Sequence, residues 1–346
     1  MSETNTKVLF KSVPEGAATV DNFDVVSEPF DLEAASAALT ENKVLLKITW
    51  LSVDPYMRGR MRKADGPKSY SLPFSIGEPF AGHGVGIVVK SKSPKYVEGD
   101  AVVGFIPWGN YVTVSGAAIT RKINIPGVPD LPHETYLGLL GMPSFTAYVG
   151  LIVLGKPKAG ETLFVSAAAG AVGQVVGQIG KRLGLRVVGS AGSDEKVNLL
   201  VTKFGFDAAF NYNKHTVIRE KLAELCPNGI DIYFENVGGA TLDAVFTLMN
   251  VHGRIPMCGM ISQYNGAGYG IKNLGAVISK RITIQGFIQS DYLADHNDAF
   301  FKWMFEHGLD GTFAYEQTVA NGIENIPNAF IGMMEGKNVG KQLIKL

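Results

Sequence analysis

Cysteine is scarce in this chain of 346 residues, which contains two, Cys226 and Cys258, far apart in the sequence. Two isolated thiols cannot form a disulfide framework or a C-x-x-C zinc cluster. The six histidines are scattered as well, without a second histidine or a cysteine a few residues away, so the spacing of a metal site is missing. A G-x-S-x-G elbow is also absent, and neither cysteine has the local signature of a nucleophile. We therefore expect no bound metal and no covalent nucleophile.

Net charge is lacking too, since 32 lysines and arginines balance 32 aspartates and glutamates. A neutral protein has no net positive field that would draw it to nucleic acid or to an anionic membrane. The N-terminal segment MSETNTKVLFKSV has no long apolar core and does not resemble a secretory signal. Residues 135–155 carry no formal charge, but glycines and a proline interrupt them, which predicts a turn and a buried helix. We expect a cytoplasmic protein with a small-molecule partner.

The chain has enough apolar sequence for two domains. Hydrophobic residues make up 46% and charged ones 18%, and 346 residues exceed the ~100–200 residues of one ordinary domain. The first part is rich in short β-type stretches, and closely spaced glycines suit a sharply bent sheet or barrel. The stretches are 43–53, 83–91 and 98–114, and the glycines are Gly82, Gly84 and Gly86.

From about residue 143 the pattern changes to strands alternating with helices, which predicts a parallel sheet. Helices are expected over 214–225 and 240–250, a further β-rich strand over 281–288, and a glycine turn with an edge strand over 336–346. The predicted fold is α/β, a doubly wound parallel sheet with a mainly β substrate domain. The predicted boundaries are 1–140 for the substrate domain, 141–309 for the dinucleotide-binding domain, and 310–346 for a return to the substrate domain.

The stretch FVSAAAGAVGQVVGQIGKRLG (164–184) resembles a dinucleotide-binding turn whose first glycine is missing. Ala168 stands where G-x-G-x-x-G would begin, and alanine fits there if the turn keeps a negative φ. Gly170 would let the backbone approach the pyrophosphate, and Gly173 would let the helix pack closely on the strand. The helix N-terminus would offer N–H groups and a positive dipole end to the phosphates. Glycines that only pack a helix on a sheet are the alternative, but the strand–helix series that follows favours a dinucleotide.

The end of the next strand indicates which dinucleotide binds. An NAD site would place Asp or Glu there to accept from the ribose 2′-hydroxyl, but residues 189–193 read Gly-Ser-Ala-Gly-Ser. Lys196 follows on the first turn of the next helix, where its ammonium could meet a 2′-phosphate. Alternatively Lys196 is a solvated lysine, weakened by Asp194 and Glu195 beside it. The small residues and the cation favour NADPH as the cofactor.

Eight segments across nearly the whole chain share their residues, in order, with one enzyme family. They are DPYMRGRM (54–61), GLLGMPSFTAY (138–148), SAAAGAVGQ (166–174), VGSAGSDEK (188–196), FNY (210–212), NGIDIYFENVGG (228–239), CGMISQYN (258–265) and GKNVGKQ (336–342). On these segments the chain resembles the zinc-free medium-chain dehydrogenase/reductases, in the branch of prostaglandin reductases and NADP-dependent alkenal double-bond reductases. Zinc-dependent relatives carry a catalytic Cys near the first segment and a His-Glu pair in the following glycine motif. This sequence has Asp54 and Tyr56 in the first place, and AGHGVG lacks the pair.

The resemblance implies a GroES-like bent-barrel substrate domain, a Rossmann domain, an active site in the cleft between them and a homodimer. It also implies a set of cofactor contacts. They are Gly170, Ala171, Val172 and Gly173 at the pyrophosphate, Lys196 and Tyr212 at the 2′-phosphate, Asn236 and the segment Cys258, Gly259, Met260, Ile261, Ser262, Gln263 and Tyr264 along the adenosine and nicotinamide, and Phe287, Ile288, Gln289 and Asn338 near the nicotinamide.

Tyr56 and Tyr264 would face the substrate, and Met142 and Met260 would line its tail pocket or belong to the core. The chemistry implied is hydride transfer from NADPH to the β-carbon of an enal or enone. A tyrosine or cofactor hydroxyl would stabilise the negative charge on the carbonyl oxygen. A quinone oxidoreductase shares the fold, cofactor and lack of zinc and remains an alternative. A non-catalytic NADPH-binding protein is the alternative from another class.

Overall fold

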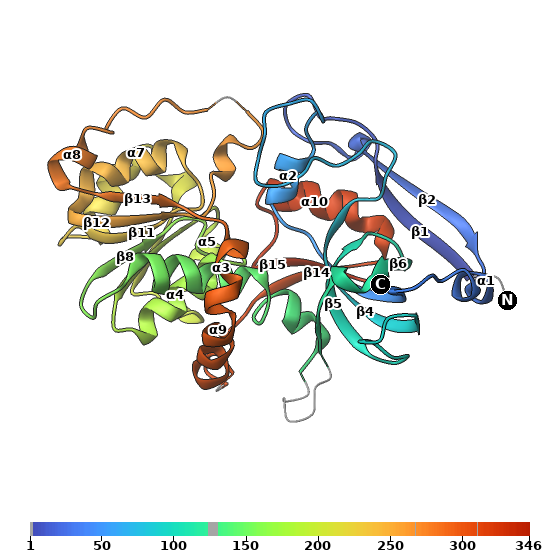
Figure 1. Ribbon diagram of the computed structural model, residues 1–346. Coiled ribbons are helices and arrows are strands. Elements are labelled where there is room, and N and C mark those ends of the chain that lie inside the picture. Colours follow the sequence, from blue (N-terminus) through green and yellow to red (C-terminus); the bar gives the residue numbers. More distant parts are fainter. Residues whose placement is uncertain (1–2, 124–130, 267, 310) are drawn as a thin grey trace. The chain divides into compact units, whose positions relative to one another are not determined.

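The computed structural model describes residues 3–123, 131–266, 268–309 and 311–346 (Figure 1). The chain divides into two compact units. One comprises Met1–Leu137 and Gln317–Leu346, and the other comprises Gly138–Glu316.

The unit of residues 138–316 is built on a parallel sheet of six strands in the order β10-β9-β8-β11-β12-β13. The strands are β8 Thr162–Val165, β9 Arg186–Ala191, β10 Ala208–Asn211, β11 Ile230–Phe234, β12 Met249–Met257 and β13 Thr283–Gly286. From β8 the chain adds β9 and β10 on one side of the sheet, and it then adds β11, β12 and β13 on the other side. The order therefore reverses between β8 and β11, and ligands of such sheets bind at the carboxyl ends of the strands at this switch point.

Helices cover both faces of this sheet, with α7 and α8 above it and α3, α4 and α9 below it in Figure 1. Their bounds are α3 Met142–Tyr148, α4 Gly173–Arg182, α5 Asp194–Thr202, α6 Ile218–Leu225, α7 Gly239–Leu248, α8 Ala276–Lys280 and α9 Leu293–His307. The central strand β8 is buried along its whole length because both of its faces are covered, whereas the edge strand β13 is largely exposed. Phe164 of β8 stacks on Tyr233 of β11, with ring centroids 5.1 Å apart, which fixes the two central strands side by side.

The other unit is mainly β. Its larger sheet has the order β14-β15-β3-β4-β5-β7, with β6 also paired to β3, and β1 and β2 form a separate antiparallel pair. The strands are β1 Glu3–Phe10, β2 Phe23–Phe30, β3 Lys43–Ser52, β4 Ala81–Ser91, β5 Ala101–Pro107, β6 Tyr111–Ser115, β7 Ile119–Lys122, β14 Gln317–Asn321 and β15 Lys341–Lys345. The helices are α1 Leu32–Ala37, α2 Tyr56–Arg60 and α10 Ile326–Met334. A Rossmann-type sheet with a separate, mainly β unit confirms the predicted fold class.

The glycines of β4 have the crowded surroundings that the sequence predicted. A Cβ atom at Gly82 would lie 2.3 Å from Met57 Cε, and one at Gly84 would lie 2.5 Å from Ile106 Cδ1. Side chains from neighbouring elements therefore occupy the space beside β4, and larger residues would push them out of the core.

Two predicted elements need correction. The C-terminal stretch was expected to be an edge strand, but β15 lies between β14 and β3 and is buried from Lys341 to Ile344. Lys341 and Lys345 at the two ends of β15 suggest solvent exposure, but Lys341 forms a buried ion pair with Asp54. The helix expected over 214–225 begins at Ile218, because Thr216 and Val217 are β-branched and the chain is extended there.

The uncharged stretch 135–155 forms α3 followed by a π-helical segment, Val149–Gly155, and most of it is buried against the parallel sheet. This agrees with the predicted turn and buried helix. Among the described residues, the helices are too short or too polar to cross a membrane.

Candidate functional site

The connection from β8 to α4 has the geometry of a dinucleotide-binding turn. The Ala168 N–H donates to the Ser190 carbonyl (2.9 Å), which seats the turn on the end of β9. Ala168, in place of the missing glycine, does not have a positive φ, whereas Ala167 beside it has φ 48°. No side chain caps the N-terminus of α4, where the Gln174 and Val175 N–H groups donate to the backbone carbonyls of Gly170 (3.2 Å) and Val172 (3.0 Å). The positive end of the helix dipole still favours an anion at this point. The alanine substitution therefore leaves the turn intact.

Gly173 and Gly170 differ in what surrounds them. A Cβ atom at Gly173 would lie 2.6 Å from the Ala167 oxygen and 2.7 Å from the Ala168 Cα atom, which are both backbone atoms. A Cβ atom at Gly170 would meet the Ala167 oxygen alone, at 3.2 Å. Gly173 is therefore needed for packing, while the space beside Gly170 is open enough for a phosphate to approach.

These surroundings predict different results for two alanine variants. Gly173→Ala should lower the free energy of unfolding by ~1–3 kcal/mol, because backbone has to shift to admit the methyl group. Gly170→Ala should unfold like the parent protein but bind NADPH more weakly. Thermal denaturation with and without NADPH measures both effects, and equal stability losses in the two variants would contradict the assignment.

The two residues predicted for a 2′-phosphate follow neighbouring strands of the parallel sheet, Lys196 after β9 and Tyr212 after β10. A Cβ atom at Gly192 would be 2.8 Å from the Tyr212 hydroxyl oxygen, so the phenol lies over the turn. Ser193 caps α5 by accepting from the Lys196 N–H (3.3 Å). The Lys196 ammonium is partly desolvated, which lowers its pKa, and Glu195 opposes this shift.

A second cation near this turn was missed by the sequence analysis. Lys214 forms an ion pair with Asp194, which also accepts from the Asn211 amide (3.0 Å). The Asp194 carboxylate is thus engaged by Lys214 and by Asn211, and both hydrogen bonds lower its pKa. Asp194 therefore competes less for Lys196 than its place in the sequence suggests.

The carboxyl ends of β8 and β11 are joined by side chains. The Asn236 amide donates to the Ser166 carbonyl (2.8 Å), and the Asn236 N–H donates to the Ser166 hydroxyl (3.0 Å). The predicted segment Cys258–Tyr264 packs along the same edge, where the Cys258 N–H donates to the Glu235 carbonyl (2.9 Å). Ser262 donates from its hydroxyl to the Val237 carbonyl (2.6 Å). The structure thus brings Asn236 and this segment together at the switch point.

Glu235 is the residue of this region that the sequence analysis did not single out. It is fully buried, and its Oε1 atom accepts from the Tyr233 hydroxyl (2.8 Å) and the Gly238 N–H (2.8 Å), while Ser166 Oγ lies 3.2 Å away. Burial raises its pKa, and the backbone donors oppose that shift. An acid directly after a buried apolar strand was the available signal. Glu235 holds together the loops on which the predicted cofactor contacts lie.

Tyr264 follows the short helical turn Ile261–Gln263 and is half-buried. A Cβ atom at Gly259 would be 3.2 Å from its hydroxyl oxygen, so the ring folds back over the Cys258–Tyr264 segment. Burial raises the pKa of the Cys258 thiol to about 12, so this thiol stays protonated at neutral pH. Tyr264 supplies the phenol hydroxyl of this segment.

The remaining predicted contacts lie in different environments. The Phe287 side chain is in the core, edge-on to Phe234 with ring centroids 6.4 Å apart, so its backbone is the part left for a ligand. Ile288 and Gln289 lead into the turn Gln289–Tyr292. Asn338 belongs to the mainly β unit, where its amide donates to the Gly340 carbonyl (2.7 Å). The role of these residues at a nicotinamide stays a prediction.

Tyr56 begins α2, and a buried ion pair lies directly before it. Lys341 and Asp54 are 1% and 3% exposed, and the Lys341 ammonium lies 3.0 Å from Asp54 Oδ1. Lys341 also donates to the Val53 carbonyl (2.7 Å) and the Gln342 carbonyl (2.9 Å). The pair therefore ties the end of β3 and the start of β15 to the peptide that carries Tyr56.

The surroundings of this pair do not fit a zinc ion. His83 is the histidine that interacts with the charges of Asp54 and Lys341, and burial lowers its pKa. The buried ammonium of Lys341 already neutralises the carboxylate and would repel a second cation. Within the described residues, no three His, Cys, Asp or Glu side chains are grouped as metal ligands would be.

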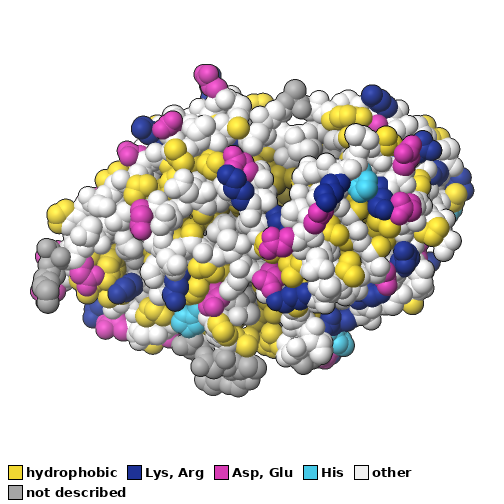
Figure 2. All heavy atoms as spheres, turned by 180° about the vertical axis from the view of Figure 1, so that it is seen from behind, with side chains coloured by type: hydrophobic (Ala, Val, Ile, Leu, Met, Phe, Trp, Pro, Cys, Tyr) yellow, Lys and Arg dark blue, Asp and Glu magenta, His cyan; other side chains and the backbone are white. Residues whose placement is uncertain are grey.

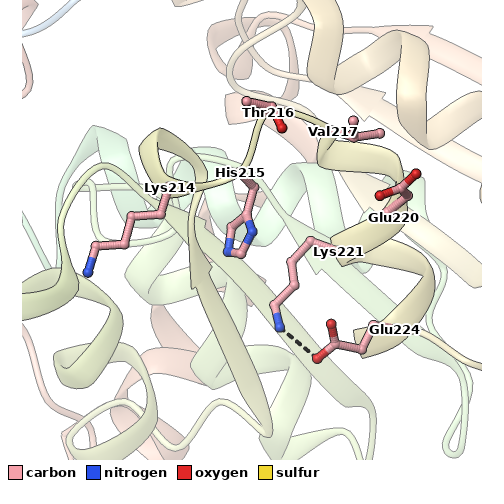
Figure 3. A pocket seen from close by; sticks show the side chains of 7 residues that line it. All are labelled: Lys214, His215, Thr216, Val217, Glu220, Lys221 and Glu224. Atoms are coloured by element: carbon pink, nitrogen blue, oxygen red, sulfur yellow. Dashed lines mark hydrogen bonds and ion pairs between the residues drawn. The ribbon is translucent and has the colours of Figure 1, made fainter.

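An open hollow of about 250 Å³ lies beside α6 (Figure 3). It is lined by Lys214, His215, Thr216, Val217, Glu220, Lys221 and Glu224. Its charged side chains are partly engaged, since Lys221 pairs with Glu224 at 2.6 Å and Lys214 pairs with Asp194. Predicted cofactor contacts are not among its lining residues. We therefore place the candidate site at the switch point of the parallel sheet.

Comparison with known proteins gives full-length relatives. Residues 6–122 match the family described as N-terminal domain of oxidoreductase, and residues 171–306 match the family described as zinc-binding dehydrogenase. The NADP(+)-dependent 2-alkenal reductase of Nicotiana tabacum is 43% identical, over 99% of this chain and 97% of that protein. Prostaglandin reductase 1 of Mus musculus is 38% identical, over 96% of both. The crystal structure of CurA from Vibrio vulnificus in complex with NADPH superposes with a TM-score of 0.88, at 39% identity and 98% coverage of both chains.

Proposed function

The chain belongs to the medium-chain dehydrogenase/reductase family, in its zinc-free branch of NADP-dependent reductases, and on this premise we propose that it reduces the carbon–carbon double bond of α,β-unsaturated aldehydes and ketones. The observation that carries the proposal is the full-length similarity to the tobacco 2-alkenal reductase. The turn after β8 and the acid-free turn after β9 support NADPH as the cofactor.

When bound, NADPH supplies the hydride that is added to the β-carbon of the substrate. Negative charge then develops on the carbonyl oxygen, and a phenol O–H of Tyr56 or Tyr264 that donates to this oxygen stabilises the enolate. A proton added at the α-carbon completes the reduction to the saturated carbonyl compound.

The proposal is tested with the purified protein, NADPH and a panel of alkenals, enones and quinones. We expect NADPH oxidation with alkenals and enones, and products that are heavier than the substrates by two hydrogens. Turnover of quinones alone would favour a quinone oxidoreductase. NADPH binding without turnover of any substrate would favour a non-catalytic binding protein.

Lys196 provides a test of the cofactor preference. Lys196→Ala should weaken NADPH binding by ~1–3 kcal/mol, the scale of a hydrogen bond to a charged group, and leave NADH binding nearly unchanged. Titration calorimetry with both cofactors measures the difference. Lys203→Ala is a matched control on the exposed C-terminal end of α5, where the ammonium pairs with Glu316. Equal losses for NADPH and NADH would remove Lys196 from the 2′-phosphate site.

We also propose a homodimer that pairs through β13. This strand is one of the two edges of the parallel sheet, and exposed apolar side chains precede it, with Leu274 56% and Ile278 82% exposed. Pairing with a second copy would cover both the open edge and these side chains. Sedimentation velocity at micromolar concentration should give the mass of two chains, and a monomer at that concentration would contradict the proposal.

Two further observations bear on partners and compartment. Lysine and arginine side chains are scattered among aspartates and glutamates on the face shown in Figure 2, which does not favour nucleic acid as a partner. Cys226 and Cys258 are both free thiols, as expected in a reducing compartment. These observations support our proposal of a cytoplasmic enzyme.

A further inference from the structure

Arg60 occupies the end of α2, four residues after Tyr56 and therefore on the same side of the helix. Its guanidinium is held in place by backbone and aromatic groups. Nε donates to the Leu72 carbonyl (2.9 Å), and Nη1 donates to the Ala81 carbonyl (2.9 Å). The guanidinium also lies over the Phe74 ring, 4.0 Å from its centroid. These contacts leave the guanidinium in one orientation.

In that orientation Arg60 faces the Tyr56 hydroxyl and interacts with it by charge and by a side-chain hydrogen bond. A guanidinium has N–H donors and no acceptor, so the phenol oxygen is the acceptor in this bond. The phenol has a single proton, and that proton is then directed to a different acceptor. This is the arrangement required of a group that donates to a substrate carbonyl.

We propose that Arg60 is the positioning residue for Tyr56 and makes Tyr56, rather than Tyr264, the phenol that donates to the substrate carbonyl. The inference rests on the proposed reduction of enals and enones. Arg60 supplies a donor to the phenol oxygen, fixes the direction of the phenol proton, and adds positive charge beside the oxygen from which the proton is shared.

The surrounding charges agree with this role. Burial raises the pKa of Tyr56, the charges of Asp54 and Tyr70 add to the rise, and Arg60 opposes it. Tyr56 is therefore a neutral phenol at physiological pH and retains its proton for donation. The negative charge of Asp54 makes the Tyr56 phenol a poorer hydrogen-bond donor, and the positive charge of Arg60 on the next turn of α2 opposes this effect.

The test is a double-mutant cycle on the full-length protein, read out as enal reduction. Arg60→Met should lower kcat by roughly 10-fold or more and leave the Kd of NADPH within about 2-fold, because a lost donor contact affects the transition state and not cofactor binding. In a Tyr56→Phe background the same substitution should change kcat by less than about 2-fold, since residues that act through one group are not additive.

Arg62→Met is the matched control. Arg62 donates to the Gly59 carbonyl (2.7 Å) and to the Ser71 carbonyl, so it fastens the same loop to α2 without a contact to Tyr56. Its kcat should stay within about 2-fold of the parent protein, as for a change remote from the reacting groups. Arg60→Lys is a second variant that keeps the charge. It should give an intermediate kcat, because one ammonium cannot hold the Leu72 and Ala81 carbonyls and the phenol together.

Equal losses from Arg60→Met in the parent and Tyr56→Phe backgrounds would overturn the inference while leaving the reductase function intact. An unchanged kcat in Arg60→Met, or a loss in Arg62→Met as large as that in Arg60→Met, would overturn it as well. If the parent protein reduced neither enals nor enones, the proposed function would fail and this inference would fail with it.

Discussion

Replacing Lys341 with methionine should lower the free energy of unfolding by about 3–5 kcal/mol, the cost of leaving one partner of a buried ion pair uncompensated. Lys341 and Asp54 are both almost fully buried, and the ammonium has three partners: the Asp54 carboxylate and the carbonyls of Val53 and Gln342. Without the lysine, the Asp54 carboxylate keeps Ser52 as its side-chain donor and loses its counter-charge. Urea denaturation followed by circular dichroism measures the loss.

The double variant Asp54→Leu/Lys341→Met should regain most of this stability, because it removes both charges from the interior and no carboxylate is left unpaired. Lys345→Met is a matched control at the other end of β15, where the exposed lysine lies over the Trp50 ring, 5.6 Å from its centroid. It should change stability by no more than about 0.5 kcal/mol, as is usual for surface positions. A Lys341→Met protein as stable as the control would contradict the buried pair.

Tyr56→Phe should reduce kcat and kcat/KM together by ~10²–10³, the loss typical when one donor to a developing oxyanion is removed. The phenyl ring keeps its packing in α2, so the loss reports the hydroxyl, and the Kd of NADPH should be little changed. Steady-state kinetics with an alkenal and fluorescence titration with NADPH measure the two quantities. The equality of the two losses matters, because an interaction made only in the transition state lowers both parameters by the same factor.

Tyr264→Phe is the comparison that separates the two phenols. If Tyr264 shapes the pocket, the variant keeps its kcat, since the ring remains. A large fall in kcat for Tyr264→Phe with normal turnover by Tyr56→Phe would exchange the roles of the two tyrosines. Full activity in the double variant would exclude both hydroxyls and leave a cofactor ribose hydroxyl or water as the donor.

The sequence by itself determined the fold class and the position of the dinucleotide turn. Strand–helix alternation after residue 143 predicts a parallel sheet because both periodicities are local properties of the chain. Gly173 could be assigned to close packing and Gly170 to ligand approach from their spacing alone, and their surroundings agree with that assignment. The absence of an acid at residues 189–193, which favours NADPH over NADH, is likewise visible in the sequence alone.

The tertiary structure alone decided which charges are buried and which side chains meet. Lys341 at the start of a terminal strand predicts solvent exposure, but pairing with β3 places it against Asp54, which is far away in sequence. Glu235 can link the loops after β8 and β11 only because these strands are neighbours in the sheet, which brings Ser166 to its carboxylate. Arg60 is fixed by the Leu72 carbonyl of a loop and the Ala81 carbonyl of β4, and the sequence does not show that these groups lie beside α2. Local patterns specify strands and turns, whereas the burial of a charge depends on distant residues that supply its counter-charge, and only the folded chain brings them together.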